Sequence, residues 1–151
     1  MKKLRAWLEA RGFSLELRNC AESAVDVGCD KLVTVDARLS PPARVSTLLH
    51  ECGHVCIFLH RRRWPRVRVA GATWNESWKN RGRCGPRARV GRLAELQEEL
   101  EAWDRGEALA RRLRLRIPRR VYERVRLRCL MTYARWAGEC MRVRRQRSKR
   151  A

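Results

Sequence analysis

The sequence predicts a single α+β domain in which a small β-sheet packs on a bundle of helices. Residues 13–17 alternate between apolar and polar side chains and residues 32–36 are rich in β-branched ones, so both segments are expected as strands. Residues 45–59 form a nearly uninterrupted apolar run, as a buried helix does. Two segments with apolar residues at helical spacing, 90–115 and 119–141, follow without any internal repeat. Strands followed by a run of helices are typical of this fold class.

The N-terminal segment and the apolar helix carry recognisable boundary signals. Residues 2–11 place two leucines and a tryptophan on one face, and Gly12 ends this pattern, so a short amphipathic helix is expected. Ser40 can cap the next helix, and the two prolines after it need no amide donor, which predicts a helix over residues 41–60. The segment 61–89 contains several glycines and prolines and is expected to be a long irregular connection.

Length and composition favour one domain followed by a short tail. A chain of 151 residues, 44% of them hydrophobic, can bury a core without disulfide or metal support. We expect this domain to cover residues 1–141, with a loop at 20–30. Residues 142–151 carry six basic and no acidic side chains and are expected to form a flexible basic tail. No segment suits a membrane span or a signal peptide, so a cytoplasmic protein without a membrane partner is expected.

The most informative motif lies inside the apolar run, where residues 50–54 read His-Glu-Cys-Gly-His. On a helix, residues four apart share a face, so the imidazoles of His50 and His54 can bind the same metal ion. Glu51 is then placed to deprotonate the attacking water molecule. This HExxH pattern predicts Zn2+ as the cofactor of a peptidase, with Glu51 as its catalytic base. A core helix with two hydrogen-bonded histidines is the alternative interpretation of the same residues.

A catalytic zinc ion usually has three protein ligands, and two regions could supply the third. His60 gives the spacing HExxHxxxxxH, which is similar to the metzincin motif HExxHxxGxxH. Ile57, however, stands where the metzincin glycine turns the chain, and a β-branched residue resists that turn. If the helix continues, His60 points away from the metal. The other region is an acidic cluster in the long helix at 90–115, and it consists of Glu98, Glu99 and Glu101.

Helix phase distinguishes the three glutamates. The expected core face of the helix carries three large apolar residues, Leu96, Leu100 and Trp103. Glu99 shares a flank with Ala102 and Gly106, whose small side chains would let that flank approach another helix closely. Glu101 lies on the solvated face and Glu98 is intermediate. The expected order is therefore Glu99, then Glu98, then Glu101, unless all three are surface carboxylates that balance arginines.

Four short segments together resemble the ImmA/IrrE-type metallopeptidases of phages, mobile elements and bacteria, which are gluzincin-like. They are the strand Leu32–Asp36, Arg44 in the following connection, Thr-Leu-Leu-His-Glu-Cys-Gly-His at 47–54, and Glu-Glu-Leu-Glu-Ala-Trp at 98–103. The resemblance covers roughly residues 31–59 and 95–110. It implies a minimal zincin-like domain with the HExxH helix at its centre.

The same resemblance implies a ligand set and a reaction. The implied zinc ligands are His50, His54 and Glu99, with Glu51 as the general base. Trp103 stands where that family tends to have asparagine. SprT-like proteases are also similar at HExxH and strongly basic, but they usually take a histidine as third ligand. The expected activity is hydrolysis of a protein or peptide substrate.

Two further parts are needed for peptide hydrolysis. The strand Leu32–Asp36 is expected at the edge of the sheet, where an extended peptide could pair with it. An oxyanion stabiliser is also required, and three side chains remain open for this role: His60, Tyr122 and Tyr133.

The net charge of +20 predicts an anionic partner. Lys and Arg number 36 against 16 Asp and Glu, so non-specific contact with nucleic-acid phosphates through the basic surface and tail is expected. Trp64, Trp74 and Trp78 lie among arginines and would either stack on single-stranded bases or fix their segment to the core.

The seven cysteines include no CxxC pair. Most are expected as small buried residues in a reducing compartment. A second zinc site formed by Cys20, Cys29 and Cys84 is the alternative.

Three functions are thus compatible with the chain. The first is a zinc metallopeptidase of phage or mobile-element type, acting in the host cytoplasm if it is phage-encoded. The second is a basic nucleic-acid-binding protein whose zincin core is structural or inactive. The third is an interaction module that holds a partner in the metal-site groove without cutting it.

Overall fold

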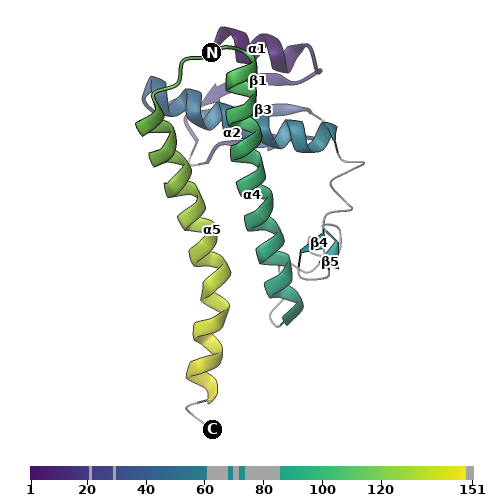
Figure 1. Ribbon diagram of the computed structural model, residues 1–151, viewed down its shortest axis with the longest axis vertical. Helices are drawn as coiled ribbons and strands as arrows, with labels where there is room; N and C mark the ends of the chain where they lie inside the picture. The colour runs from purple at the N-terminus through teal and green to yellow at the C-terminus, as the bar shows by residue number, and fades with distance from the viewer. Residues whose placement is uncertain (21, 29, 61–67, 70–71, 74–85, 149–151) are drawn as a thin grey trace. The chain divides into compact units, whose positions relative to one another are not determined.

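The computed structural model (Figure 1) describes the chain except for six gaps, which are residues 21, 29, 61–67, 70–71, 74–85 and 149–151. The side chains of residues that border some of these gaps are also not described. The described chain forms two compact units. The first consists of Met1–Leu59 and Glu101–Leu127, and the second of His60–Leu100 and Arg128–Ala151. Its architecture is α+β, as expected, with a small mixed sheet and four helices.

The sheet of the first unit has three strands in the order β1-β3-β2. β1 (Ser14–Arg18) pairs with β3 (Leu32–Asp36) in parallel, and β2 (Ala24–Asp26) pairs with the other side of β3 in antiparallel orientation. The expectation that Leu32–Asp36 forms a sheet edge is therefore wrong. β2 lies in the segment 20–30 that was expected as a loop, because three residues are too few to show an alternating pattern.

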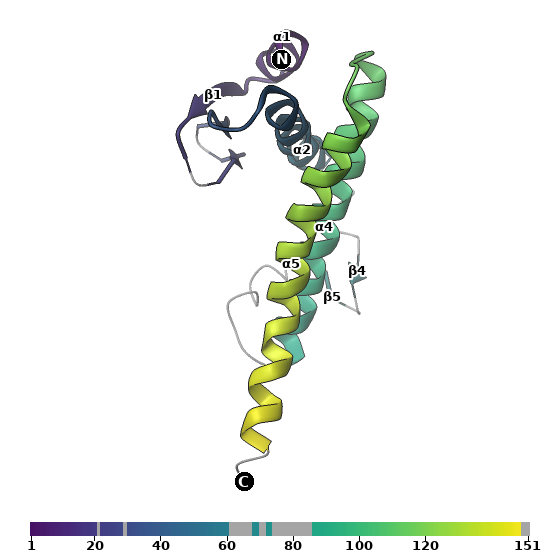
Figure 2. The same cartoon turned by 90° about the vertical axis from the view of Figure 1, so that its left-hand side faces the viewer.

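Two helices cover one face of this sheet (Figure 2), and both agree closely with the sequence expectation. α1 (Lys2–Glu9) buries Leu4, Trp7 and Leu8, as its apolar stripe predicted. α2 (Pro41–Leu59) carries the HExxH motif and contacts β3, β2 and α1. Arg44 on its first turns donates to the carbonyl oxygens of Ala37 and Leu39, at 2.8 and 3.0 Å, and so fixes the connection from β3 to α2.

The two long helices start or end outside the predicted bounds. α4 (Pro86–Arg112) begins at a proline, which suits a first helical position, and so shortens the expected irregular segment. That segment also contains a small antiparallel pair, β4 (Arg68–Val69) and β5 (Ala72–Thr73). α5 (Arg119–Ser148) continues helical beyond residue 141, into the segment expected as a tail.

Both helices belong to the first unit over part of their length, α4 from Glu101 and α5 up to Leu127. None of the helices in the described part of the chain is both long and apolar enough to cross a bilayer.

Candidate metal centre

The HExxH residues occupy the middle of α2, where most side chains are buried. His50 and Glu51 are buried and His54 is half-buried. The two imidazoles point their Nε2 atoms at the same place, 3.3 Å apart, with the ring planes at 76°. Two nitrogen atoms bound at about 2.05 Å to one tetrahedral ion are separated by about 3.3 Å. The spacing of the histidines therefore fits a shared zinc ion without any rearrangement of α2.

Small residues bring α4 against this helix within the first unit. A Cβ atom added at Gly53 would overlap the backbone carbonyl of Ala102, and one added at Gly106 would overlap that of Leu49. The prediction that the flank with small residues at positions 102 and 106 approaches another helix closely is confirmed, and that helix is α2. Backbones in such contact leave no room for side chains between them.

Trp103 fixes the plane of the His50 imidazole. Its indole ring stacks on His50 at a centroid distance of 4.4 Å and an angle of 18°. The ring of Tyr122, from α5, contacts the Trp103 indole edge-on at a centroid distance of 5.3 Å. The Tyr122 hydroxyl donates a hydrogen bond to the Trp103 carbonyl oxygen at 2.8 Å. Both aromatic side chains are almost completely buried. The stacked indole of Trp103 thus restricts the plane of the His50 ring.

Glu99 is the buried member of the acidic cluster, with 6% exposure, whereas Glu98 and Glu101 are half-buried. Glu101 accepts a hydrogen bond from Arg105 at 2.6 Å, as a surface carboxylate does. The expectation that Leu100 lies on the core face is wrong, since its side chain is 39% exposed. The contact with α2 places Ala102, Trp103 and Gly106 inside, and this rotates Leu100 outward together with Asp104.

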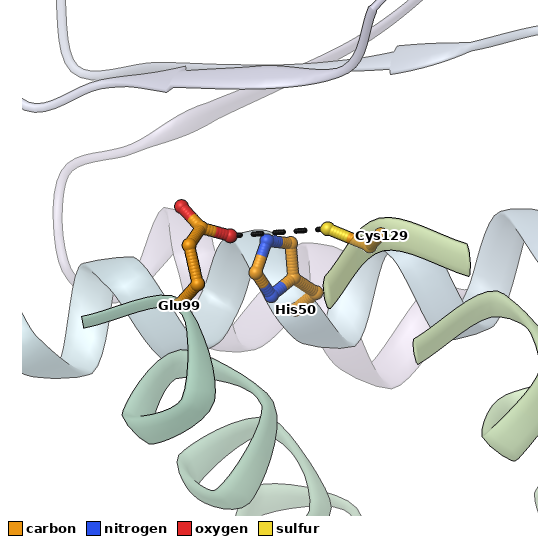
Figure 3. A group of neighbouring side chains, drawn as sticks. All are labelled: His50, Glu99 and Cys129. Atoms are coloured by element: carbon orange, nitrogen blue, oxygen red, sulfur yellow. Dashed lines mark hydrogen bonds between the residues drawn. The ribbon is translucent and has the colours of Figure 1, made fainter. Parts of the chain in front are cut away.

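Two residues of α5 lie beside Glu99 in the second unit. The Cys129 thiol donates to Glu99 Oε2 at 3.9 Å (Figure 3). Burial raises the pKa of Tyr133, and the neighbouring Glu99 carboxylate, to which Tyr133 is hydrogen-bonded, raises it further. Cys129 was expected only as a small buried residue, and its spacing of four from Tyr133 is the signal that could have placed it on the same face.

The remaining candidates are placed elsewhere or lie outside the described residues. His60 follows the last residue of α2 and is exposed. The Tyr122 hydroxyl is engaged with a core carbonyl, so of the two tyrosines only Tyr133 is near a candidate ligand. Five residues fall in undescribed segments: Cys29, Trp64, Trp74, Trp78 and Cys84.

Of the two cysteines of the HExxH helix, Cys52 is buried and Cys56 is half-buried. Burial raises the pKa of the Cys52 thiol well above its usual range, and it also raises that of Cys56. Cys52 therefore packs as the small core side chain that was expected.

Comparisons with known proteins add no family to this geometry: no protein-family model, curated protein or solved structure matches the chain.

Proposed function

We propose that this protein is a zinc-dependent metallopeptidase of phage or mobile-element type that hydrolyses peptide bonds of a protein substrate in the cytoplasm. The observation that carries this proposal is the pair of Nε2 atoms 3.3 Å apart on a buried HExxH helix, with Glu51 beside the first histidine. Two imidazoles held at this separation fit one tetrahedral ion, and the motif supplies a carboxylate next to it.

Glu99 is the proposed third ligand, and helix continuity supports it. Glu99 lies four residues before Trp103 on the uninterrupted helix α4, so the two side chains share a face one turn apart. Trp103 stacks directly on His50. The proposed donors are the imidazoles of His50 and His54 and the carboxylate of Glu99. Two imidazoles and one carboxylate form the donor set of a catalytic zinc site that keeps one position open.

The protein's own side chains have separate roles in this mechanism. A zinc ion at this position would supply Lewis-acid activation of a water molecule and of the scissile carbonyl. Glu51 accepts the proton of the attacking water and later delivers one to the leaving amine. Tyr133, which is hydrogen-bonded to Glu99, is the candidate donor to the oxyanion that forms as the carbonyl becomes tetrahedral.

We propose that the substrate pairs with β2 and not with β3, the strand expected from the sequence. β3 has neighbours on both sides, so the free edges of the described three-stranded sheet belong to β1 and β2. β2 contacts the HExxH helix, and an extended peptide added to its open edge would run beside that helix.

Removal of the Glu51 carboxylate tests the activity. We expect Glu51→Gln to retain one zinc ion per chain and to lose at least about 100-fold in hydrolysis of a casein substrate, as loss of a general base does. His50→Ala should lose the zinc ion itself. Full hydrolysis by the Gln variant, or zinc retention by the His50 variant, would refute the proposal.

Cys129 favours one competing function. A site made of two histidines, Glu99 and Cys129 would have four protein ligands, and closed sites of this kind are structural. The protein would then be a basic nucleic-acid-binding protein with an inactive zincin core. The metal sites of the two proposed functions differ in one ligand atom, because only the structural site has the Cys129 sulfur bound to the metal.

A further inference from the structure

The turn between α4 and α5 is the most basic part of the first unit. Residues 111–126 contain eight arginines and one glutamate. Leu113, Leu115 and Ile117 alternate with exposed arginines through the turn and are themselves half-buried. The apolar side chains thus attach the turn to the fold, and the guanidinium groups point to solvent.

Acidic neighbours neutralise only some of these arginines. The ion-paired members are Arg111 and Arg119 with Glu107, Arg119 with Glu123, and Arg126 with Asp104. Five exposed arginines make no ion pair with any residue that the structure describes, and they are Arg112, Arg114, Arg116, Arg120 and Arg124. Uncompensated positive charge at this density repels itself, so a polyanion bound here would be stabilising.

A pocket of about 290 Å³ lies at the same turn and is lined by residues between Glu107 and Arg126. Its apolar lining comes from Ala110, Leu115, Ile117 and Tyr122. Its charged lining comes from Glu107, Glu123, Arg111, Arg119 and Arg126. Arg119 bridges the two carboxylates at 3.8 and 2.7 Å. The pocket therefore combines an apolar lining with carboxylate acceptors that Arg119 holds in place.

We infer that this turn, with its pocket, is a binding site for single-stranded nucleic acid. The five unpaired guanidinium groups contact phosphates, for which their planar forks are well shaped. An unstacked base enters the pocket and packs on the apolar lining. The amino group of the base donates hydrogen bonds to the carboxylates of Glu107 and Glu123. A membrane surface fits less well, because the apolar side chains of the turn are half-buried and the two carboxylates would repel anionic headgroups.

The test compares two double variants of the full chain. Arg114→Gln with Arg116→Gln removes two charges at the turn, and Arg18→Gln with Lys31→Gln removes two charges at the sheet. Each pair includes one residue with positive φ, Arg114 at 50° and Lys31 at 44°, so backbone effects are matched. Binding to a fluorescent oligodeoxycytidine of about 12 nucleotides, whose bases carry an amino group, is measured by anisotropy over a salt series.

If nucleic acid binds at the turn, only the turn variant should show a weaker salt dependence of binding. The slope of log K against log salt concentration should fall by about 1.4 in the turn variant, or about 0.7 for each lost phosphate contact, and stay unchanged in the sheet variant. Wild-type protein should bind the single strand more tightly than the same length of duplex. Equal losses in both variants, tighter binding of duplex, or tighter binding to phosphatidylserine vesicles than to the oligonucleotide would overturn the inference.

Discussion

At the scale of single residues, the central question is how the orientation of His50 is fixed. In many metal sites the ring of a ligating histidine is held by a hydrogen bond from its second nitrogen. Here an indole lies flat on the ring, 4.4 Å away, and is itself held by Tyr122. Stacking restricts the plane of the imidazole in much the same way as a hydrogen bond restricts its direction. Trp103 is therefore a positioning residue in the proposed zinc site.

Substitution of Trp103 separates stacking from general stability. Trp103→Leu should weaken zinc binding about 10- to 100-fold, as loss of an orienting neighbour does, whereas Trp103→Phe should weaken it less because a ring remains. Zinc affinity is measured by competition with a chelator. Leu109→Ala, at another buried position of α4, is the control for destabilisation and should leave the affinity unchanged. Equal affinities of the Leu and Phe variants would contradict the positioning role.

At the scale of elements, the contact between α2 and α4 decides where the site forms. The sequence predicts α1, β3, α2 and this contact, because apolar periodicity and small residues on one flank are local signals. It does not predict β2, whose three residues pair only because β3 offers an open side. The central position of β3 follows from that pairing. Non-local pairing of a very short strand leaves no signal in its own residues.

The helix contact predicts a sharp contrast between two glycines. Gly106→Ala places a methyl group against the backbone of Leu49, which cannot move aside, and should destabilise the protein by about 1–3 kcal/mol or more. Gly138→Ala, in α5, meets nothing within 4 Å and should stabilise by about 0.5–1 kcal/mol through helix propensity. Urea unfolding measures both. A neutral Gly106→Ala would show that the two helices are not in backbone contact.

The end of β3 predicts a pH effect. Hydrogen bonds from the Arg38 side chain and backbone hold the pKa of Asp36 below its usual range. A lowered folded-state pKa contributes stability above the unfolded pKa, near 3.9, and this contribution is lost as the pH falls through the folded value. Wild-type protein should therefore lose more stability than Asp36→Asn between about pH 5 and pH 3. Parallel pH profiles of the two proteins would contradict this assignment.

At the scale of the whole molecule, the basic turn and the candidate metal site are separate features of one chain. The HExxH helix, its close contact with α4 and the buried Glu99 support a hydrolase, while the arginine-rich turn supports a polyanion partner. The sequence alone predicts both a hydrolase and a polyanion partner, because motif spacing and net charge can be determined without the structure. It does not locate the basic surface, since the ion pairs that neutralise Arg111, Arg119 and Arg126 exist only after folding.

The nature of the metal ligands tests the central proposal most directly. Zinc-loaded protein, purified with one equivalent of metal, is measured by X-ray absorption at the zinc edge. We expect the zinc ion to be coordinated by nitrogen and oxygen atoms alone, near 2.0–2.1 Å, with the imidazole signature of two histidines. A sulfur atom at about 2.3 Å would place Cys129 on the metal, close the site and contradict a hydrolase.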